Sequence, residues 1–339
     1  MKKAIKILHS IETKSLTKSF GSVIAVNDIS FSVKTGEIFG FLGPNGAGKS
    51  TTMMILTTLL KPTSGQALIS EFNVMENAKK VRENIGFVQQ ETTVDEYLTG
   101  RENLLLQAKL NHIPKNQIKQ RIDEVLELIE LSDKQNDAVV TYSGGMRKRL
   151  DIAGGLLHRP KVLFLDEPTV GLDIQTRRKI WEYIKKIHKE FDMTIFLSTH
   201  YMEEADNLCD RIGIIDGGKI QVIDSPENLK NAMGNEVISI IMDDSDNRDS
   251  FLSKLEEIES VNNINQDGTK LTLFVSNGTK VIPTIFQISS ELEIKITTIS
   301  LTRPTLDDVF LSYTGHEIRD DDSKFNRRRE HARMKRISS

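Results

Sequence analysis

The chain contains little cysteine and no long hydrophobic run. Cys209 is its one cysteine, which excludes an internal disulfide framework and fits a reducing compartment. No stretch approaches the roughly 18 to 20 consecutive apolar residues that a membrane-spanning helix requires. The first residues are basic, but polar residues from His9 onward deny them the apolar core of a secretory signal. We therefore expect a soluble, cytoplasmic protein that acts on a membrane only through a partner.

The chain also lacks a large net charge, an internal repeat and a long heptad pattern. Its 45 Lys and Arg residues against 48 Asp and Glu give a net charge of −3, a balance that does not indicate a nucleic-acid partner. The missing heptads exclude a long coiled coil. The length of 339 residues is sufficient for two domains of ordinary size.

The most informative segment that is present has the spacing of a phosphate-binding loop. It follows an apolar run, residues 38–42, that predicts a buried strand, and it precedes residues 51–60, which predict a helix. The pattern G-x-x-x-x-G-K-[ST] requires this context, and a chance glycine-rich turn would lack it. Glycines let backbone N–H groups turn toward an anion, and the helix N-terminus adds its positive dipole end. The predicted nucleotide-binding residues are Gly43, Pro44, Asn45, Gly46, Ala47, Gly48, Lys49, Ser50 and Thr51.

Side chains suited to a nucleotide and its metal occur in this loop and at the end of a second apolar run. Lys49 can reach the β- and γ-phosphates, and Ser50 offers a hydroxyl to Mg²⁺. Residues 162–165 predict a strand that ends in Asp166 and Glu167. There Asp166 can hold Mg²⁺ through water, and Glu167 can accept the proton of an attacking water. The two acids could instead cap the next helix, but the phosphate loop favours the metal interpretation.

A second predicted helix start has the features of an anion site. Ser143, Gly144 and Gly145 open a helical stretch just before the strand that carries Asp166, and a helix N-terminus attracts phosphate. One nucleotide has one triphosphate, which the first loop already holds. We therefore expect this second terminus to serve the nucleotide of a neighbouring chain. The alternative is an ordinary N-cap by Ser143.

The hydrophobic pattern predicts an α/β fold with a smaller α+β domain after it. Continuous apolar runs at 23–26, 85–88, 162–165, 194–197 and 212–215 indicate a mostly parallel sheet with helices on both faces. Helices are predicted at 102–110 and 118–129, in a helical subdomain of about residues 91–158. After residue 225, strands and helices predict the order β-α-β-β-α-β, the split ferredoxin-like pattern. The domains are 11–225, 236–312 and a disordered basic tail, 319–339, which could rest on anionic lipid or simply be solvated.

The order of these segments resembles the ATP-binding subunits of ABC transporters. It reads GPNGAGKST, Gln90, YSGGM at 142–146, LDEP at 165–168, GLD at 171–173 and STH at 198–200. The resemblance covers residues 11–225 and implies a P-loop NTPase cassette. It implies that Phe20 stacks on adenine and that Gln90 touches Mg²⁺ and the attacking water in a loop that meets the membrane partner. It also implies that His200 contacts the γ-phosphate and that the loop of Asp173 communicates between two sites.

Three further segments resemble the daunorubicin-resistance type of exporter ATPase, which carries a small C-terminal domain. They are residues 94–104, 142–151 and 305–315. Tyr142 and Met146 depart from the usual Leu-Ser-Gly-Gly-Gln signature, and the contacts of the missing glutamine are left open. The C-terminal domain could regulate the subunit or help it assemble, through an apolar edge of Leu306, Val309, Phe310 and Leu311, or could simply be inert packing.

The resemblance implies an ATPase subunit, with ATP and Mg²⁺ as cofactors, that powers export through a separate membrane permease. Two copies, or one copy and a related ATPase subunit, would sandwich two ATP molecules while lying peripherally on the inner face of the cell membrane. The rival class is an ATPase of the same fold that drives no transport, such as a translation factor or a DNA-repair clamp. Those proteins carry two cassettes or a long coiled coil, whereas the sequence shows one cassette. A plain P-loop kinase or GTPase leaves the Ser143 helix start unexplained.

Overall fold

The chain folds into two compact units, which are described separately. The computed structural model describes residues 9–234, 236–243 and 247–316. The first unit is Met1–Ala232 and the second is Met233–Ser339. The predicted basic tail, residues 319–339, lies outside the described residues. Across the described ranges, no helix combines the length and the apolar character needed to span a membrane.

A six-stranded sheet organises the first unit. All neighbouring strands in it are parallel except the edge pair β10–β9, so the prediction of a mostly parallel sheet is confirmed for these strands. Strands β3, β7 and β8 are buried along their whole length, because helices or a second sheet cover both faces. In sheet order the strands are β10 (Lys219–Asp224), β9 (Arg211–Asp216), β3 (Ile38–Leu42), β8 (Thr194–Thr199), β7 (Val162–Asp166) and β6 (Ile85–Val88).

The apolar run 23–26 does not belong to this sheet, which corrects the prediction made for it. It begins β2, in a separate four-stranded antiparallel sheet. The reason is local: a turn of Gly21 and Ser22 joins β1 to β2, with Gly21 at φ 58°, and a connection this short can join only antiparallel strands. The sheet order is β2 (Val23–Lys34), β1 (His9–Phe20), β4 (Ser64–Ile69) and β5 (Phe72–Asn73).

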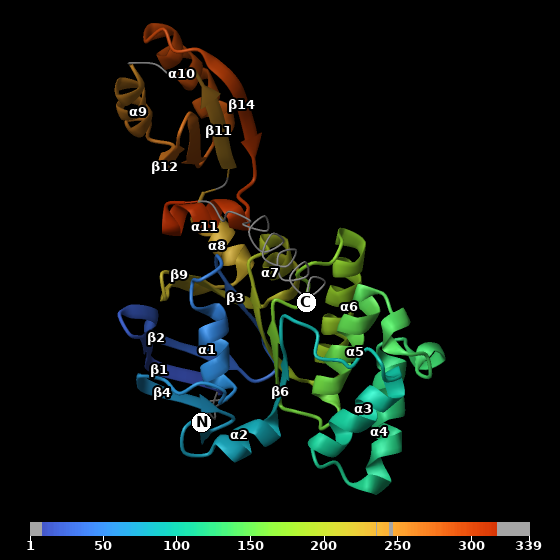
Figure 1. Cartoon of the computed structure of the whole chain (residues 1–339). Helices are drawn as coiled ribbons and strands as arrows, with labels where there is room; N and C mark the ends of the chain where they lie inside the picture. Colours follow the sequence, from blue (N-terminus) through green and yellow to red (C-terminus); the bar gives the residue numbers. More distant parts are fainter. Residues whose placement is uncertain (1–8, 235, 244–246, 317–339) are drawn as a thin grey trace, which may run out of the picture. The chain divides into compact units, whose positions relative to one another are not determined.

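Helix α1 (Lys49–Leu56) lies between the two sheets, and α5 and α6 lie on the other side of the six-stranded sheet (Figure 1). The helix ends at Leu56, earlier than the predicted residue 60, because Thr58 adopts φ 66° and Leu59 is exposed. The buried face of α1 joins the core between the sheets. In the described part of the first unit, the remaining helices outside the helical subdomain are α2 (Ala78–Asn84), α6 (Ile174–Phe191), α7 (Met202–Leu208) and α8 (Pro226–Ala232).

Three helices form the predicted helical subdomain. Helix α3 (Gly100–Leu110) starts with a capping box, in which Thr99 and Glu102 satisfy each other's backbone N–H groups. Helix α4 (Lys115–Leu128) buries its apolar stripe, as the spacing predicts. Two short 3-10 turns lead to α5 (Gly144–Leu156). The two helices expected from periodicity are thus confirmed, with their starts a few residues earlier.

Phe196 is central to the core of the first unit. Its ring is fully buried and lies 5.5–6.0 Å from the ring centroids of Phe164, Phe41, Phe39 and Phe31. Phe196→Ala is expected to lower the free energy of unfolding by about 3–5 kcal/mol, because it leaves a cavity among these rings. Denaturant unfolding followed by the fluorescence of Trp181, the one tryptophan, measures this unit. Leu59→Ala is the exposed control; an equal loss in both variants would contradict the central role of Phe196.

The second unit has the predicted β-α-β-β-α-β order. Its sheet has the order β12-β13-β11-β14 with every pair antiparallel, as in a split ferredoxin-like fold. Two helices pack on one face over a core that includes Phe251 and Ile285. The elements are β11 (Glu236–Met242), α9 (Arg248–Glu256), β12 (Val261–Asp267), β13 (Lys270–Val275), α10 (Gly278–Glu291) and β14 (Ile296–Thr302), followed by α11 (Leu306–Thr314).

The expected apolar edge near the end of the chain is not an exposed surface. The side chains of α11 that suggested it are buried, with Val309 and Phe310 fully so. Amphipathic spacing alone cannot distinguish a helix face that packs within its own chain from one that meets a second subunit. The argument for assembly through Leu306, Val309, Phe310 and Leu311 is therefore wrong.

Candidate nucleotide site

The phosphate loop connects β3 to α1 and has a backbone that needs glycine at two close approaches. A Cβ atom at Gly43 would lie 2.1 Å from the Ile215 carbonyl oxygen, and one at Gly48 would lie 2.4 Å from that of Ala25. Gly48 also has φ 106°, in the left-handed region. No side chain of the described residues caps the first turn of α1, so its N–H groups can bind an anion. The loop fits the phosphates of a nucleotide.

Lys49 is buried at the base of this loop. Its Nζ donates to the carbonyl oxygens of Gly43, at 2.7 Å, and Pro44, at 3.0 Å, and lies 3.2 Å from Glu167 Oε1. Burial lowers the pKa of Lys49 below its ordinary value, although the charge of Glu167 opposes this shift. The site therefore contains a cation with one carboxylate partner at the end of β7.

Asp166 ends β7 next to the start of α1. Its Oδ1 accepts hydrogen bonds from Ser198 Oγ at 2.5 Å and Ser50 Oγ at 3.2 Å. Burial raises the pKa of Asp166, while these two hydrogen bonds oppose the rise. A hydroxyl and a carboxylate oxygen side by side suit Mg²⁺, which prefers oxygen ligands. No group of three His, Cys, Asp or Glu side chains able to hold a metal occurs in the described ranges, so a metal here would take further ligands from phosphate and water.

Glu167 has an unusual backbone conformation and lies close to Lys49 and His200. Its φ of 44° is in the left-handed region, which is unfavourable for a residue with a Cβ atom. Its N–H donates to the backbone and side-chain oxygens of Ser198, each at 3.1 Å. His200 Nδ1 lies 3.2 Å from Glu167 Oε2. Burial alone would raise the pKa of Glu167, but His200 and Lys49 together lower it, so the carboxylate is ionised at neutral pH.

Gln90 lies beyond the end of β6, in an exposed loop that the helical subdomain holds in place. Lys148 of α5 donates to the carbonyl oxygens of Gln89, at 2.7 Å, and Gln90, at 3.4 Å. One turn later, Asp151 accepts from Thr93 Oγ1 at 2.6 Å. The segment from residue 89 to residue 93 is thus tied at both ends to the helix that Ser143 begins.

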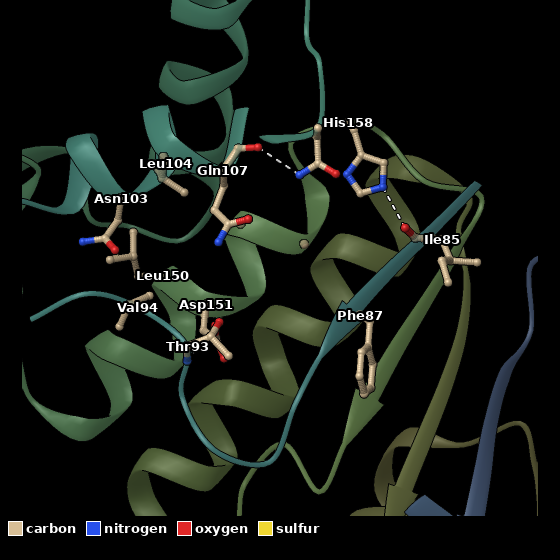
Figure 2. Close-up of a pocket in the computed structure, with 13 residues that line it drawn as sticks. Ile85, Phe87, Thr93, Val94, Asn103, Leu104, Gln107, Leu150, Asp151 and His158 are labelled. Carbon is tan, nitrogen blue, oxygen red and sulfur yellow. Dashed lines mark hydrogen bonds between the residues drawn. The ribbon is translucent and has the colours of Figure 1, made fainter. Parts of the chain in front are cut away.

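A polar cavity of about 170 Å³ lies beside this segment, between α3, α5 and β6 (Figure 2). Asp151 and Thr93 line one part of it, and His158, whose Nε2 is 2.7 Å from the Ile85 carbonyl oxygen, lines another. Burial lowers the pKa of His158 and raises that of Asp151. The cavity therefore opens where the Gln90 loop meets the helical subdomain.

The other predicted residues make their own local contacts. Ser143 caps α5, accepting from the Met146 N–H at 3.3 Å, and Gly145 approaches Thr176 so closely that a Cβ atom would be 2.4 Å from Thr176 Cγ2. Within the described residues, Ser143 forms no hydrogen bond with the loop 43–51. Asp173 caps α6 through the Thr176 N–H at 3.0 Å. Phe20 ends β1, half exposed, with Lys18 Nζ 4.9 Å from its ring centroid.

The tertiary structure adds residues that the motifs did not assign. Ser198 was part of the quoted STH segment, and it proves to hydrogen-bond Asp166 and the backbone of Glu167. Tyr142, at the departure from the usual signature, is buried and donates to the Lys134 carbonyl oxygen at 2.5 Å. A Cβ atom at Gly100 would lie 2.5 Å from the Tyr142 hydroxyl oxygen. Tyr142 thus anchors the start of α5 within the helical subdomain.

A phosphate loop after β3, an Asp-Glu pair at the end of β7, which β8 separates from β3 in the sheet, and a helical subdomain define an ATP-binding cassette. The ABC transporter family model matches residues 26–170, and the model of the C-terminal domain of DrrA1-3-like ATP-binding proteins matches residues 225–314. The linearmycin resistance ATP-binding protein LnrL of Bacillus subtilis is 35% identical over 91% of this chain and 100% of its own. The doxorubicin resistance ATP-binding protein DrrA of Mycobacterium tuberculosis is 37% identical over 87% of this chain and 89% of its own.

Solved structures agree with this class. The structure of cbiO1 from Clostridium perfringens, part of an ABC transporter complex, covers 66% of this chain and 93% of its own with a TM-score of 0.62 and 28% identity. A dimeric ATP-binding cassette bound to ADP and Pi covers 63% of this chain and 98% of its own with a TM-score of 0.57 and 29% identity. The chain belongs to the ATP-binding subunits of ABC transporters, in the branch with a DrrA-like C-terminal domain. It is an ATPase of this family, whose subunits work with a membrane permease.

Proposed function

We propose that this subunit hydrolyses ATP at the carboxyl ends of β3, β7 and β8 and thereby powers export through a separate permease. One observation supports the assignment most: Glu167 is held between Lys49 Nζ and His200 Nδ1, each at 3.2 Å. Lys49 and the loop 43–51 bind the phosphates, with Phe20 stacking on the base. Glu167 accepts the proton of the attacking water, and His200 and Gln90 position that water at the γ-phosphate.

Mg²⁺ is the metal that the oxygen donors of this site suit. Ser50 and Asp166 would hold it, Asp166 through water, and the Gln90 side chain would complete the protein contribution. When bound, the ion neutralises charge on the β- and γ-phosphates. The chain's own contribution is the carboxyl pair of Asp166 and Glu167 beside the buried Lys49.

The second half of each hydrolytic centre comes from another copy of the chain. Ser143, Gly144 and Gly145 would contact the nucleotide bound by the partner's phosphate loop, and Asp173 would carry information between the two centres. The Ser143 oxygen accepts its hydrogen bond from Met146, so its hydroxyl proton is free to be donated to a phosphate. A dimeric cassette among the related structures supports this arrangement. ATP would then favour the closed dimer, because only that state satisfies the phosphates on both sides.

The permease would receive the movement of the cassette through the Gln90 loop. Lys148 and Asp151 tie that loop to α5, so a shift of the helical subdomain moves both together. We propose that part of the permease lies against the adjacent cavity (Figure 2), which would place the subunit on the inner face of the cell membrane. By analogy with the relatives, the cargo would be a drug-like compound, and residues 11–225 would form the cassette with 236–312 as an accessory domain.

Lys49→Ala tests this function. The variant is expected to bind ATP more weakly and to lose turnover and export together, because the phosphates lose their buried cation. The measurements are nucleotide affinity and ATPase rate of the subunit co-purified with its permease. Lys179→Ala, an exposed lysine on α6, is the matched control. Normal hydrolysis by the Lys49 variant would contradict the proposed site.

A further inference from the structure

His200 is held by a stack of side chains that begins on α6. The guanidinium carbon of Arg177 lies 3.8 Å from the ring centroid of Tyr201. The Tyr201 ring lies 4.1 Å from the imidazole centroid of His200, tilted by 43°. The imidazole Nδ1 is 3.2 Å from Glu167 Oε2. Four side chains thus form a continuous series from the first turn of α6 to the carboxylate beside Lys49.

The placement of Arg177 is explained by the ring that it covers. A guanidinium above an aromatic face is attracted by the negative face of the ring, and more strongly where water is excluded. Within the described residues, the buried Arg177 Nε has no hydrogen-bond partner. The nearby Glu204 is fully buried but accepts hydrogen bonds from Thr169, at 2.7 Å, and Trp181, at 2.9 Å. Burial raises the pKa of Glu204, and the charge of Arg177 opposes that rise, so the Tyr201 ring and this buried carboxylate together hold Arg177 in place.

The stack is joined to the loop that Asp173 ends. The Arg177 N–H donates to the Asp173 carbonyl oxygen at 2.8 Å, in the first turn of α6. Tyr201 is fixed on its own side, because its N–H donates to Thr199 Oγ1 at 3.0 Å. A displacement of the start of α6 must move the guanidinium across the Tyr201 ring, and the imidazole packs on that ring.

We propose that Tyr201 and Arg177 are positioning residues that set the orientation of the His200 imidazole and make it responsive to the start of α6. The inference rests on the role proposed above for His200. The contacts that the structure gives for the two residues, to each other and to His200, do not include the phosphate loop 43–51, so the two would act on the turnover of bound ATP and leave its binding unchanged. The contacts that carry this inference are those of the Tyr201 ring, so an aromatic ring is what position 201 requires.

The test compares Tyr201→Phe, Tyr201→Leu, Arg177→Met and His200→Ala in the full chain with its permease. Tyr201→Leu is expected to lower kcat by about 10- to 100-fold with KM for ATP unchanged, because a small misplacement at the reacting centre is costly. Tyr201→Phe should retain wild-type turnover. Arg177→Met should also lower kcat. In the double variant, which carries both Tyr201→Leu and Arg177→Met, the increase in activation free energy should be smaller than the sum of the increases in the two single variants. Arg178→Met, on the exposed next position of α6, is the control.

The outcomes separate this inference from the proposed function. If His200→Ala hydrolyses ATP normally, the role proposed for His200 is wrong. If His200→Ala is inactive while Tyr201→Leu and Arg177→Met match the wild type, only the positioning inference is wrong. A loss in Tyr201→Phe equal to that in Tyr201→Leu, or a rise in KM without a fall in kcat, also overturns it. Trp181 fluorescence monitors folding, and if Tyr201→Leu does not fold, the kcat of Arg177→Met against Arg178→Met decides.

Discussion

Glu167→Gln is expected to stop ATP turnover while leaving ATP bound between two subunits. An amide cannot accept the proton of the attacking water, and the loss of a general base lowers kcat by about 10²- to 10⁴-fold. The substitution also removes the carboxylate that lies 3.2 Å from Lys49 Nζ. The full charge of Lys49 is then available to the phosphates, so nucleotide affinity should be maintained or increased. Hydrolysis no longer reopens the closed dimer, which should accumulate.

Two measurements test this expectation. The ATPase rate of the complex with its permease should fall, and light scattering of the variant with Mg-ATP should show a dimer. Glu182→Gln, an exposed acid on α6, should behave as the wild type in both. A variant that stayed monomeric with Mg-ATP, even when tethered to the permease, would contradict the shared site. A variant that hydrolysed ATP at the wild-type rate would remove Glu167 from the role of base.

Mixing two inactive variants is expected to restore activity. Lys49→Ala disables the phosphate loop of a chain, and Ser143→Arg places a bulky cation at the start of its α5. Each variant alone has two defective centres in its dimer. In a mixed dimer, both defects fall on one centre, and the other combines an intact loop with an intact α5. Random pairing of equal amounts leaves about a quarter of all centres intact.

The ATPase rate of the mixture, compared with the same total amount of each variant, measures this complementation. The control replaces Ser143→Arg with a chain carrying both substitutions. A dimer of that chain with Lys49→Ala has no intact phosphate loop, so no activity should return. If the mixture of Lys49→Ala and Ser143→Arg is also inactive although both chains enter dimers, the proposal is contradicted. ATP hydrolysis at the phosphate loop of one chain would then not depend on α5 of its partner. The structure of the single chain is consistent with this dependence, since Ser143 caps α5 and, within the described residues, forms no hydrogen bond with the loop 43–51.

Local spacing was enough to predict the class of the protein and much of its fold. The glycines and Lys49 lie in one short segment, and Asp166 and Glu167 directly follow a buried strand. The β-α-β-β-α-β order of the second unit follows from period-two and helical patterns within short windows. Such features depend on neighbours in sequence, because backbone conformation and side-chain periodicity are local properties. Even so, the run 23–26 was assigned to the wrong sheet, since an apolar run does not say which strand it pairs with.

The sequence by itself determined that the chain belongs to a nucleotide-binding class, and it predicted which residues approach the phosphates. Only the tertiary structure decided how the surrounding side chains meet. The contact of Lys49 with Glu167, the hydrogen bonds of Ser198 to Asp166 and Glu167, and the stack of Arg177 on Tyr201 join separate segments of the first unit. These contacts depend on strand order in the sheet and on the packing of α6. Neither is encoded in the spacing of any one segment, because many distant residues determine both together.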